Sequence, residues 1–367
     1  MIKQSVPYVN IAGQYNIFKH EILPAVYRTL QEGNYILGEE VSKFERAIAS
    51  YCKTDYAIGV ANGTDALRLS LRALDVGSGD EVITAPNSFI ATAGAIVETG
   101  ARPVFVDVRD DYNINPDLIE TAITPRTKAI MPVHLTGRPA AMNEIMNIVE
   151  KHGLYVIEDA AQSIGACYHG KLTGSLGTIG CFSAHPLKTL HTLGDGGFIT
   201  TNNKNLRDFI SKLRNHGLKN RDEVEFFGYN SRLDEIHAAI LNTQLQYVNA
   251  WNEKRRTIAD YYRRELSSVV NTPQDKEYEQ ASYHTFIIRA EKRDELQTYL
   301  DRKDIKTKVH YPIPIHLQEA ARWLGYQKGS FPIAEMQAQE ILSLPVYPEL
   351  TQQQIEYVAK SIKDFYQ

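Results

Sequence analysis

The chain has 367 residues, of which 43% are hydrophobic and 23% are charged. This length excludes a small isolated module, and the hydrophobic content is enough for the cores of two domains, or of one large domain with a small additional lobe. The net charge is −4, from 40 basic and 44 acidic residues, so there is no basic excess for nucleic acid or an anionic membrane. We expect neither as a partner.

The N-terminus has no apolar run typical of a signal peptide, and no segment approaches the roughly 20 apolar residues of a membrane span. We therefore expect a cytoplasmic protein. Three cysteines, Cys52, Cys167 and Cys181, are too few for a disulfide framework and are expected to be buried thiols.

Between residues 56 and 200, short β-rich runs alternate with amphipathic segments, which predicts a series of βαβ units. Such a series forms a mainly parallel sheet with helices on both faces, a three-layer α/β/α architecture. The expected strands are 56–60, 82–84, 103–106, 129–131, 154–157 and 198–201, and the expected helices include 67–74, 90–98, one beginning at Pro116 and 141–151.

Residues 231–265 contain neither Pro nor Gly, which predicts a long, almost unbroken helical stretch. We interpret this stretch as the bridge to a smaller α+β lobe. The lobe would contain the apolar run 285–288, a charged helix near 292–302, the segment 307–310 and a terminal amphipathic helix. The predicted division is a large domain at 1–245 and a small C-terminal domain at 246–367.

The first candidate site is Asn62-Gly63-Thr64-Asp65-Ala66, between an expected strand and an expected helix. A helix N-terminus after a glycine offers free N–H groups and the positive end of the helix dipole, which suits a phosphate. A simple N-cap at Thr64 or Asp65 is the structural alternative. No G-x-G-x-x-G or Walker-type pattern occurs, which argues against a dinucleotide fold and a P-loop enzyme.

Two further candidates are single side chains. Asp159 follows an apolar strand, where a carboxylate can pair with the protonated nitrogen of a ligand, although it could instead cap the next helix. Lys188 lies in an otherwise uncharged stretch between two expected strands. There a lowered pKa would make its amine a nucleophile, although a lone lysine is often only a solvated surface charge.

The order of the three candidates is informative. A phosphate cradle, then an acid, then a lysine is the set that pyridoxal 5'-phosphate (PLP) needs: an anchor, a partner for the ring nitrogen and an amine for a Schiff base. We predict PLP as the cofactor, with pyridoxamine 5'-phosphate as its intermediate form. We expect no metal, because His134, His191 and His316 lack metal-ligand spacing.

The sequence resembles the DegT/DnrJ/EryC1/StrS sugar aminotransferases, which belong to fold type I of the PLP enzymes. The resemblance runs nearly end to end. It rests on ordered blocks at Gly33–Gly38, Gly59–Leu67, Gly79–Ile83, Glu158–Gln162, Phe182–Lys188, Gly228–Leu233 and Ser343–Pro345.

The resemblance implies roles for individual residues. Lys188 would form the Schiff base and move the proton, and Asp159 would keep the ring nitrogen protonated. The other cofactor contacts would be Gln162 on the ring hydroxyl, Phe89 stacked on the ring, and Gly63, Thr64, Ser183 and, from a neighbouring subunit, Asn230 on the phosphate. The shared contact implies a homodimer with shared active sites.

The resemblance also implies a reaction. The amino group of L-glutamate would pass to a keto-sugar by a ping-pong Schiff-base mechanism, for amino-sugar and lipopolysaccharide biosynthesis. The acceptor would be either a nucleotide-linked keto-deoxyhexose or an 8-oxo-3-deoxy-octulosonate. The implied substrate contacts are His185, Arg221, His310 and Tyr311.

Two alternatives remain open. Another fold type I enzyme, an aldolase or a β-eliminating lyase, would release glycine or pyruvate without a keto acceptor. A non-enzymatic effector sensor would carry an added DNA-binding module, for which few residues precede Gly33.

Overall fold

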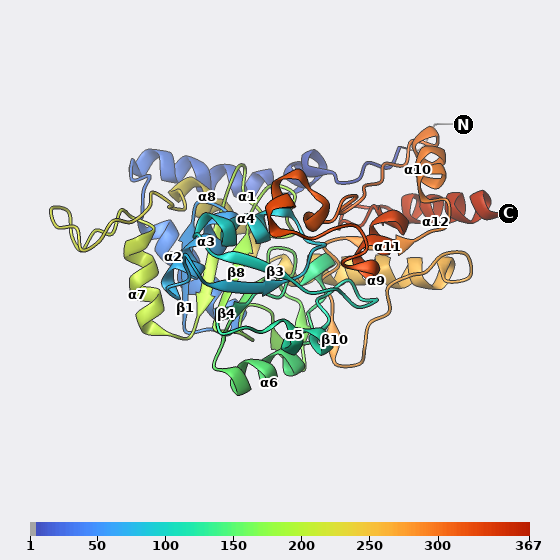
Figure 1. Ribbon diagram of the computed structural model, residues 1–367. Coiled ribbons are helices and arrows are strands. Elements are labelled where there is room, and N and C mark those ends of the chain that lie inside the picture. Colours follow the sequence, from blue (N-terminus) through green and yellow to red (C-terminus); the bar gives the residue numbers. More distant parts are fainter. Residues whose placement is uncertain (1–4) are drawn as a thin grey trace.

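The computed structural model describes residues 5–367, so the first four residues of the predicted large domain lie outside the described part of the chain. A seven-stranded sheet forms its centre, with strand order β1-β9-β8-β5-β4-β2-β3 (Figure 1). The strands are β1 (Tyr56–Val60), β2 (Glu81–Thr84), β3 (Arg102–Phe105), β4 (Thr127–Ile130), β5 (Tyr155–Asp159), β8 (Ile179–Ser183) and β9 (Gly197–Thr201).

The sheet is mainly parallel, as the alternating pattern predicts. Strands β3, β2, β4, β5 and β8 pair in parallel, and only β9 runs antiparallel to its neighbours β8 and β1. Because parallel strands end at one edge of a sheet, the residues after β2 and β5 are brought to the same edge.

Helices cover both faces of this sheet, which confirms the three-layer architecture. Two successive residues of β9 point to opposite faces of the sheet. Ile199 packs in the cluster beneath α3, α4 and α7, whereas Phe198 packs in the cluster beneath α2 and α8. The helices of this part are α1 (Ile11–Glu32), α2 (Glu39–Cys52), α3 (Gly63–Ala73), α4 (Ile90–Glu98), α5 (Pro116–Ala122), α6 (Met142–His152), α7 (Lys204–Leu213) and α8 (Glu235–Leu245).

The stretch 231–265 is helical over most of its length, as predicted, but it divides into two helices. It begins as the extended lead-in to α8, which ends at Leu245, and α9 (Val248–Leu266) starts after a turn in which Tyr247 N donates to Gln244 O at 2.9 Å. Each helix has its own partners, because α8 packs on α1 and α2 whereas α9 packs on α12. Tertiary packing therefore breaks a stretch that intrinsic propensity would leave continuous.

The C-terminal part has a separate apolar cluster built from α9, α10 (Arg293–Arg302), α12 (Gln352–Tyr366) and a two-stranded antiparallel sheet of β11 (Phe286–Arg289) and β12 (Ile341–Leu344). The segment 307–310 forms no strand of its own and meets β12 at Ser343, through a bridge from Lys308 and a side-chain contact from His310. Val6 is fully buried in the same cluster. The domain boundary at residue 245 stays a prediction.

The remaining elements are short or peripheral. They are β6 (Cys167–Tyr168), β7 (Lys171–Leu172), β10 (Glu279–Gln280), the 3-10 turns η1 (Leu135–Gly137), η2 (Ile315–Leu317) and η3 (Glu319–Leu324), and α11 (Pro332–Glu340). Within residues 5–367, no helix combines the length and apolar character needed to cross a bilayer.

Candidate active site

Lys188 lies on the loop 184–196, which joins β8 to β9. The two strands hold the ends of the loop together, since Ser183 pairs with Gly197 and Ala184 N donates to Gly196 O at 2.8 Å. Within the loop, Lys188 N donates to His185 O at 2.8 Å. His191 Nδ1 lies 3.1 Å from Lys188 O and must be the donor, because a carbonyl only accepts. The backbone of Lys188 is thus held on both sides.

The amine of Lys188 has an unusual acidity. Burial lowers its pKa from the usual 10.5 to about 8, while the charge of Asp159 acts in the opposite direction. The neutral amine, which is the nucleophilic form, is therefore far more populated near neutral pH than in an ordinary lysine.

Asp159 is the last residue of β5 and is buried. Its backbone is fixed to the loop after β4, because Asp159 N donates to Pro132 O at 2.9 Å and His134 N donates to Asp159 O at 3.0 Å. Its carboxylate accepts from Thr92 Oγ1 at 2.7 Å and from Ala161 N at 3.3 Å. Burial raises the pKa of Asp159, and these two donors together with Lys188 and His134 oppose that rise.

Gln162 connects the end of β5 to the C-terminal part of the chain. Its Oε1 accepts from Thr136 N at 2.7 Å, and its Nε2 lies 3.5 Å from Tyr311 Oη. The ring of Tyr311 lies 5.7 Å from that of Phe89, centroid to centroid. Phe89 immediately precedes α4 and is 55% exposed, so its ring remains open to a stacking partner.

The N-terminus of α3 meets the end of β8 very closely. A Cβ added to Gly63 would lie 2.7 Å from Ser183 Cβ, and one added to Gly197 would lie 2.5 Å from the backbone of Asn62. The N-cap of α3 is Asn62, whose Oδ1 accepts from Asp65 N at 2.8 Å, so the alternative of a cap at Thr64 or Asp65 was wrong. The first intrahelical bond runs from Ala66 N to Asn62 O, which leaves Gly63 N and Thr64 N in front of it.

These residues fit the groups of PLP. Because Gly63 has no side chain, the start of α3 can lie close to Ser183. The N–H groups of the helix and the hydroxyls of Thr64 and Ser183 then form a cradle of donors that suits a phosphate. The buried Asp159 carboxylate suits a protonated ring nitrogen, and Lys188, whose charge acts on Asp159, suits the aldehyde.

Of the four predicted substrate residues, His185 lies on the lysine loop and His310 lines a cavity beside it. A cavity of about 670 Å³ is lined by Leu187 and His310, together with Tyr8 and Lys308. His310 Nδ1 lies 3.0 Å from Ser343 Oγ, and burial lowers the pKa of His310 to about 4, so this ring is neutral. Tyr311 faces Gln162, as described above. His185 is exposed, and its Nδ1 accepts from Leu187 N at 3.2 Å.

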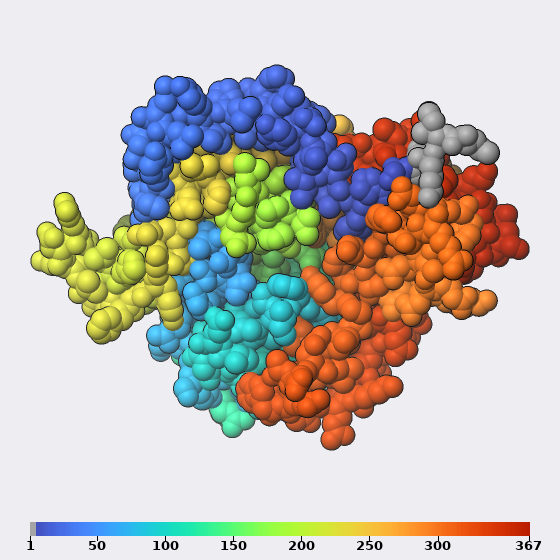
Figure 2. Space-filling model, turned by 90° about the horizontal axis from the view of Figure 1, so that it is seen from above, coloured from blue at the N-terminus to red at the C-terminus, as the bar shows by residue number. Residues whose placement is uncertain are grey.

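Arg221 and Asn230 belong to the segment that joins α7 to α8, and both are exposed. Residues 217–228 of this segment, which we call the arm, project from the body of the molecule (Figure 1). In Figure 2 the lime segment around the lysine loop lies instead between the blue N-terminal helices and the cyan and orange segments. Asn230 pairs with Asn215, and the next residue, Ser231, accepts from Ala61 N at 3.3 Å, one residue before Asn62.

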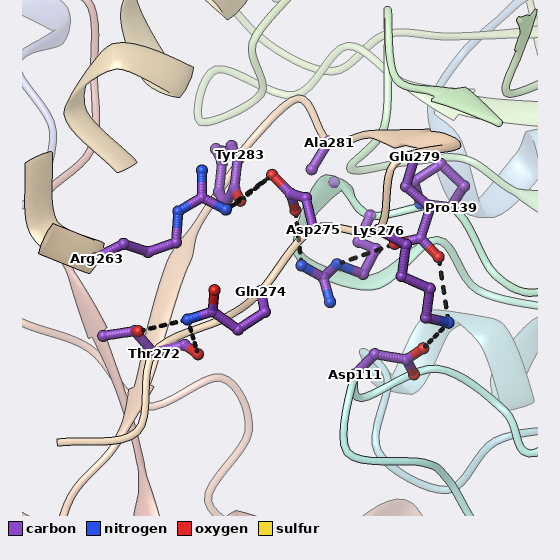
Figure 3. Close-up of polar contacts among 12 residues, drawn as sticks. Asp111, Pro139, Arg263, Thr272, Gln274, Asp275, Lys276, Glu279, Ala281 and Tyr283 are labelled. Carbon is purple, nitrogen blue, oxygen red and sulfur yellow. Dashed lines mark hydrogen bonds and ion pairs between the residues drawn. The ribbon is translucent and has the colours of Figure 1, made fainter. Parts of the chain in front are cut away.

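A network of charged side chains supports the turn that contacts Gln162 (Figure 3). Arg138, which follows η1, lies 2.7 Å from Asp275, and Asp275 in turn lies 3.1 Å from Arg263. Next to it, Ser282 N donates to Gly137 O at 2.9 Å. The segment 271–283 thus fixes η1, whose Thr136 N–H orients Gln162.

Sequence reasoning missed two residues that contact the central pair. Thr92 donates to Asp159, and His191 donates to the carbonyl of Lys188. Thr92 left a faint signal, because it is a single hydroxyl in the apolar run Ile90–Val97. His191 left none that separates it from an ordinary histidine.

The comparison with known proteins agrees with this geometry. Residues 16–363 match the DegT/DnrJ/EryC1/StrS aminotransferase family. The chain is 45% identical to a pleiotropic regulatory protein of Geobacillus stearothermophilus over 99% of each chain. It is 40% identical to the dTDP-3-amino-3,4,6-trideoxy-alpha-D-glucose transaminase of Streptomyces venezuelae, over 98% of this chain and 96% of the relative.

Solved structures give the same result. The crystal structure of S. venezuelae DesV in complex with a ketimine intermediate superimposes with a TM-score of 0.97 at 40% identity, covering 99% of both chains. Related aminotransferase structures hold the PLP or pyridoxamine phosphate form of the coenzyme.

The fold and the matched site define a fold type I PLP enzyme. More narrowly, the chain belongs to the DegT/DnrJ/EryC1/StrS aminotransferase family and is a PLP-dependent sugar aminotransferase of amino-sugar biosynthesis.

Proposed function

We propose that the enzyme transfers the amino group of L-glutamate to carbon 3 of a nucleotide-linked keto-hexose. The observation that carries the proposal is the convergence of the Lys188 amine, the Asp159 carboxylate and the Gly63–Ser183 cradle. The names of four relatives support the acceptor, because each describes a transferase for a 3-amino or 3-oxo nucleotide sugar. We therefore favour this acceptor over an 8-oxo-octulosonate.

The protein's own groups have distinct tasks in this proposal. PLP, when bound, supplies an electron sink for the charge left by removal of the donor's α-proton. Lys188, with a pKa of about 8, accepts and returns that proton. Asp159 holds the ring nitrogen in its charged form, and Gln162 and Phe89 orient the ring. Gly63, Thr64 and Ser183 hold the phosphate.

The proposal includes a homodimer with shared active sites. The arm carries Phe227, which is fully exposed, and α1 presents Ile17 and Tyr27, which are 59% and 63% exposed. Covering these side chains with a second copy would remove apolar surface from water. It would also let Asn230 and Arg221 serve the site of the partner.

Mixed subunits test the shared site. Lys188→Ala and Asn230→Ala proteins should each be inactive alone, and co-refolded mixtures should regain activity, because some hybrid dimers contain one intact site. A monomer in analytical ultracentrifugation, or mixtures without activity, would contradict the shared site.

Two measurements test the reaction. Borohydride reduction of the purified enzyme should attach the coenzyme to Lys188, as read by peptide mass spectrometry. The pyridoxamine form should then be mixed with 3-keto and 4-keto nucleotide sugars and with 8-oxo-3-deoxy-octulosonate. Only the 3-keto sugar should restore the visible absorbance of PLP. Release of glycine or pyruvate without a keto acceptor would instead indicate an aldolase or a lyase.

A further inference from the structure

Thr92 occupies an unusual position in the first turn of α4. It is 1% exposed, and its hydroxyl donates to Asp159 Oδ2 at 2.7 Å. A helical threonine commonly donates to the carbonyl four residues earlier, in this case Ser88. The hydroxyl has only one proton, and Thr92 directs it to the carboxylate instead. The bond joins a helix to the end of a strand 67 residues later.

The two carboxylate oxygens of Asp159 accept hydrogen bonds of different length. Oδ2 accepts the short bond from Thr92, whereas Oδ1 accepts a longer one, 3.3 Å, from Ala161 N. Lys188 and His134 act on this carboxylate, and Tyr311 and Cys181 are further titratable groups that feel its charge. Burial favours the neutral acid, and among the opposing influences Thr92 is the largest. The carboxylate therefore depends on Thr92 to keep its charge and its direction.

We propose that Thr92 is a positioning residue for the coenzyme: its hydroxyl holds Asp159 as an oriented carboxylate, so that the shared proton stays on the ring nitrogen. The inference rests on the proposed role of Asp159. Without the hydroxyl, Asp159 is a stronger base and draws the proton from the ring nitrogen toward itself. The ring is then a weaker electron sink, which slows chemistry more than it weakens substrate binding.

The experiment compares three variants loaded with PLP that carries ¹⁵N in its ring. Thr92→Val keeps the shape of the side chain and removes the donor, whereas Thr92→Ser keeps the donor and removes a methyl group. Asp159→Asn is the reference for loss of the acid. The readouts are the ring ¹⁵N chemical shift at neutral pH, and kcat and KM with L-glutamate.

Thr92→Val should move the ¹⁵N signal from the pyridinium position toward that of free pyridine. It should also lower kcat about 10- to 100-fold, the usual range for loss of a hydrogen bond to a charged group, with a smaller change in KM. Thr92→Ser should restore both values to near those of the wild type. Circular dichroism of each variant checks that the fold is retained.

The outcomes distinguish a wrong role for Thr92 from a wrong role for Asp159. If Asp159→Asn loses the pyridinium signal but Thr92→Val keeps it together with wild-type kcat, the inference about Thr92 is overturned while the role of Asp159 stands. If Asp159→Asn also keeps the signal, the role of Asp159 itself is wrong. If Thr92→Ser is as impaired as Thr92→Val, the methyl group rather than the donor is responsible, and the inference fails.

Discussion

Glu158 Oε2 lies 2.8 Å from His134 Nε2, and both side chains are completely buried. Glu158 immediately precedes Asp159 in the chain. His134 Nδ1 accepts from Ala140 N at 3.0 Å, so the ring proton is on Nε2 and is donated to Glu158. The same carboxylate accepts three backbone N–H groups, from Gly174, Leu176 and Gly177. Glu158 is thus a fully bonded internal anchor for the end of β5.

Glu158→Gln should destabilise the protein strongly. An amide has one accepting oxygen, so the donors facing the other position would meet an NH₂ group in a fully buried site. We expect the free energy of unfolding to fall by about 3–5 kcal/mol, the usual cost of breaking a buried charge network. Urea unfolding followed by circular dichroism measures it. Glu150→Gln, on the exposed side of α6, is the matched control and should change stability little.

Gly63→Ala should weaken coenzyme binding, because the new methyl group would lie 2.7 Å from Ser183 Cβ and must push α3 away from β8. Gly94→Ala is the control within α4: nothing lies within 4 Å of its added Cβ, and the protein should gain up to about 1 kcal/mol from helix propensity. Equilibrium titration of each apoenzyme with PLP gives the two Kd values. Equal Kd values would show that the close approach does not form the phosphate site.

The lowered pKa of Lys188 predicts how stability depends on pH. The unfolded chain binds a proton at this amine up to its usual pKa of 10.5, whereas the folded chain releases it near 8. Folding without coenzyme is therefore penalised fully below pH 8, and the penalty disappears as the pH rises from 8 to 10.5. Apo Lys188→Met should resist urea better than the apo wild type at pH 7, and the difference should shrink across this window. A constant difference would contradict the assignment.

Arg138→Met should destabilise the junction between η1 and the segment 271–283. The substitution keeps an apolar stem but removes one of the two cations beside each of Asp275 and the buried Glu279, which retain Arg263 and Lys276. We expect a loss of about 1–3 kcal/mol in urea unfolding, because each carboxylate keeps a second cation. Arg28→Met, at an exposed position of α1, is the control. If both variants unfold alike, the network in Figure 3 contributes no net stability.

The sequence predicted six of the seven strands of the sheet, because they are apolar runs bounded by amphipathic helices and both patterns are local; β8 was missed. Strand β9 was expected, but its antiparallel direction depends on the hairpin with β8, which no local pattern reports. The break after Leu245 depends on which neighbours α8 and α9 find. Local motifs likewise pointed to Asp159 and Lys188, whereas Thr92 gains its meaning only from a contact 67 residues away.

The loop of Lys188 also has a kinetic consequence. A lysine that forms a Schiff base with the coenzyme and then releases it must form that bond again in every cycle. Its loop closes at both ends on paired strands, and His185 and His191 fix its backbone between them. In the role proposed for Lys188, the hydrogen-bonded loop would limit motion mainly to the four-carbon side chain, so that recapture of a bound coenzyme would be an intramolecular event at high effective molarity.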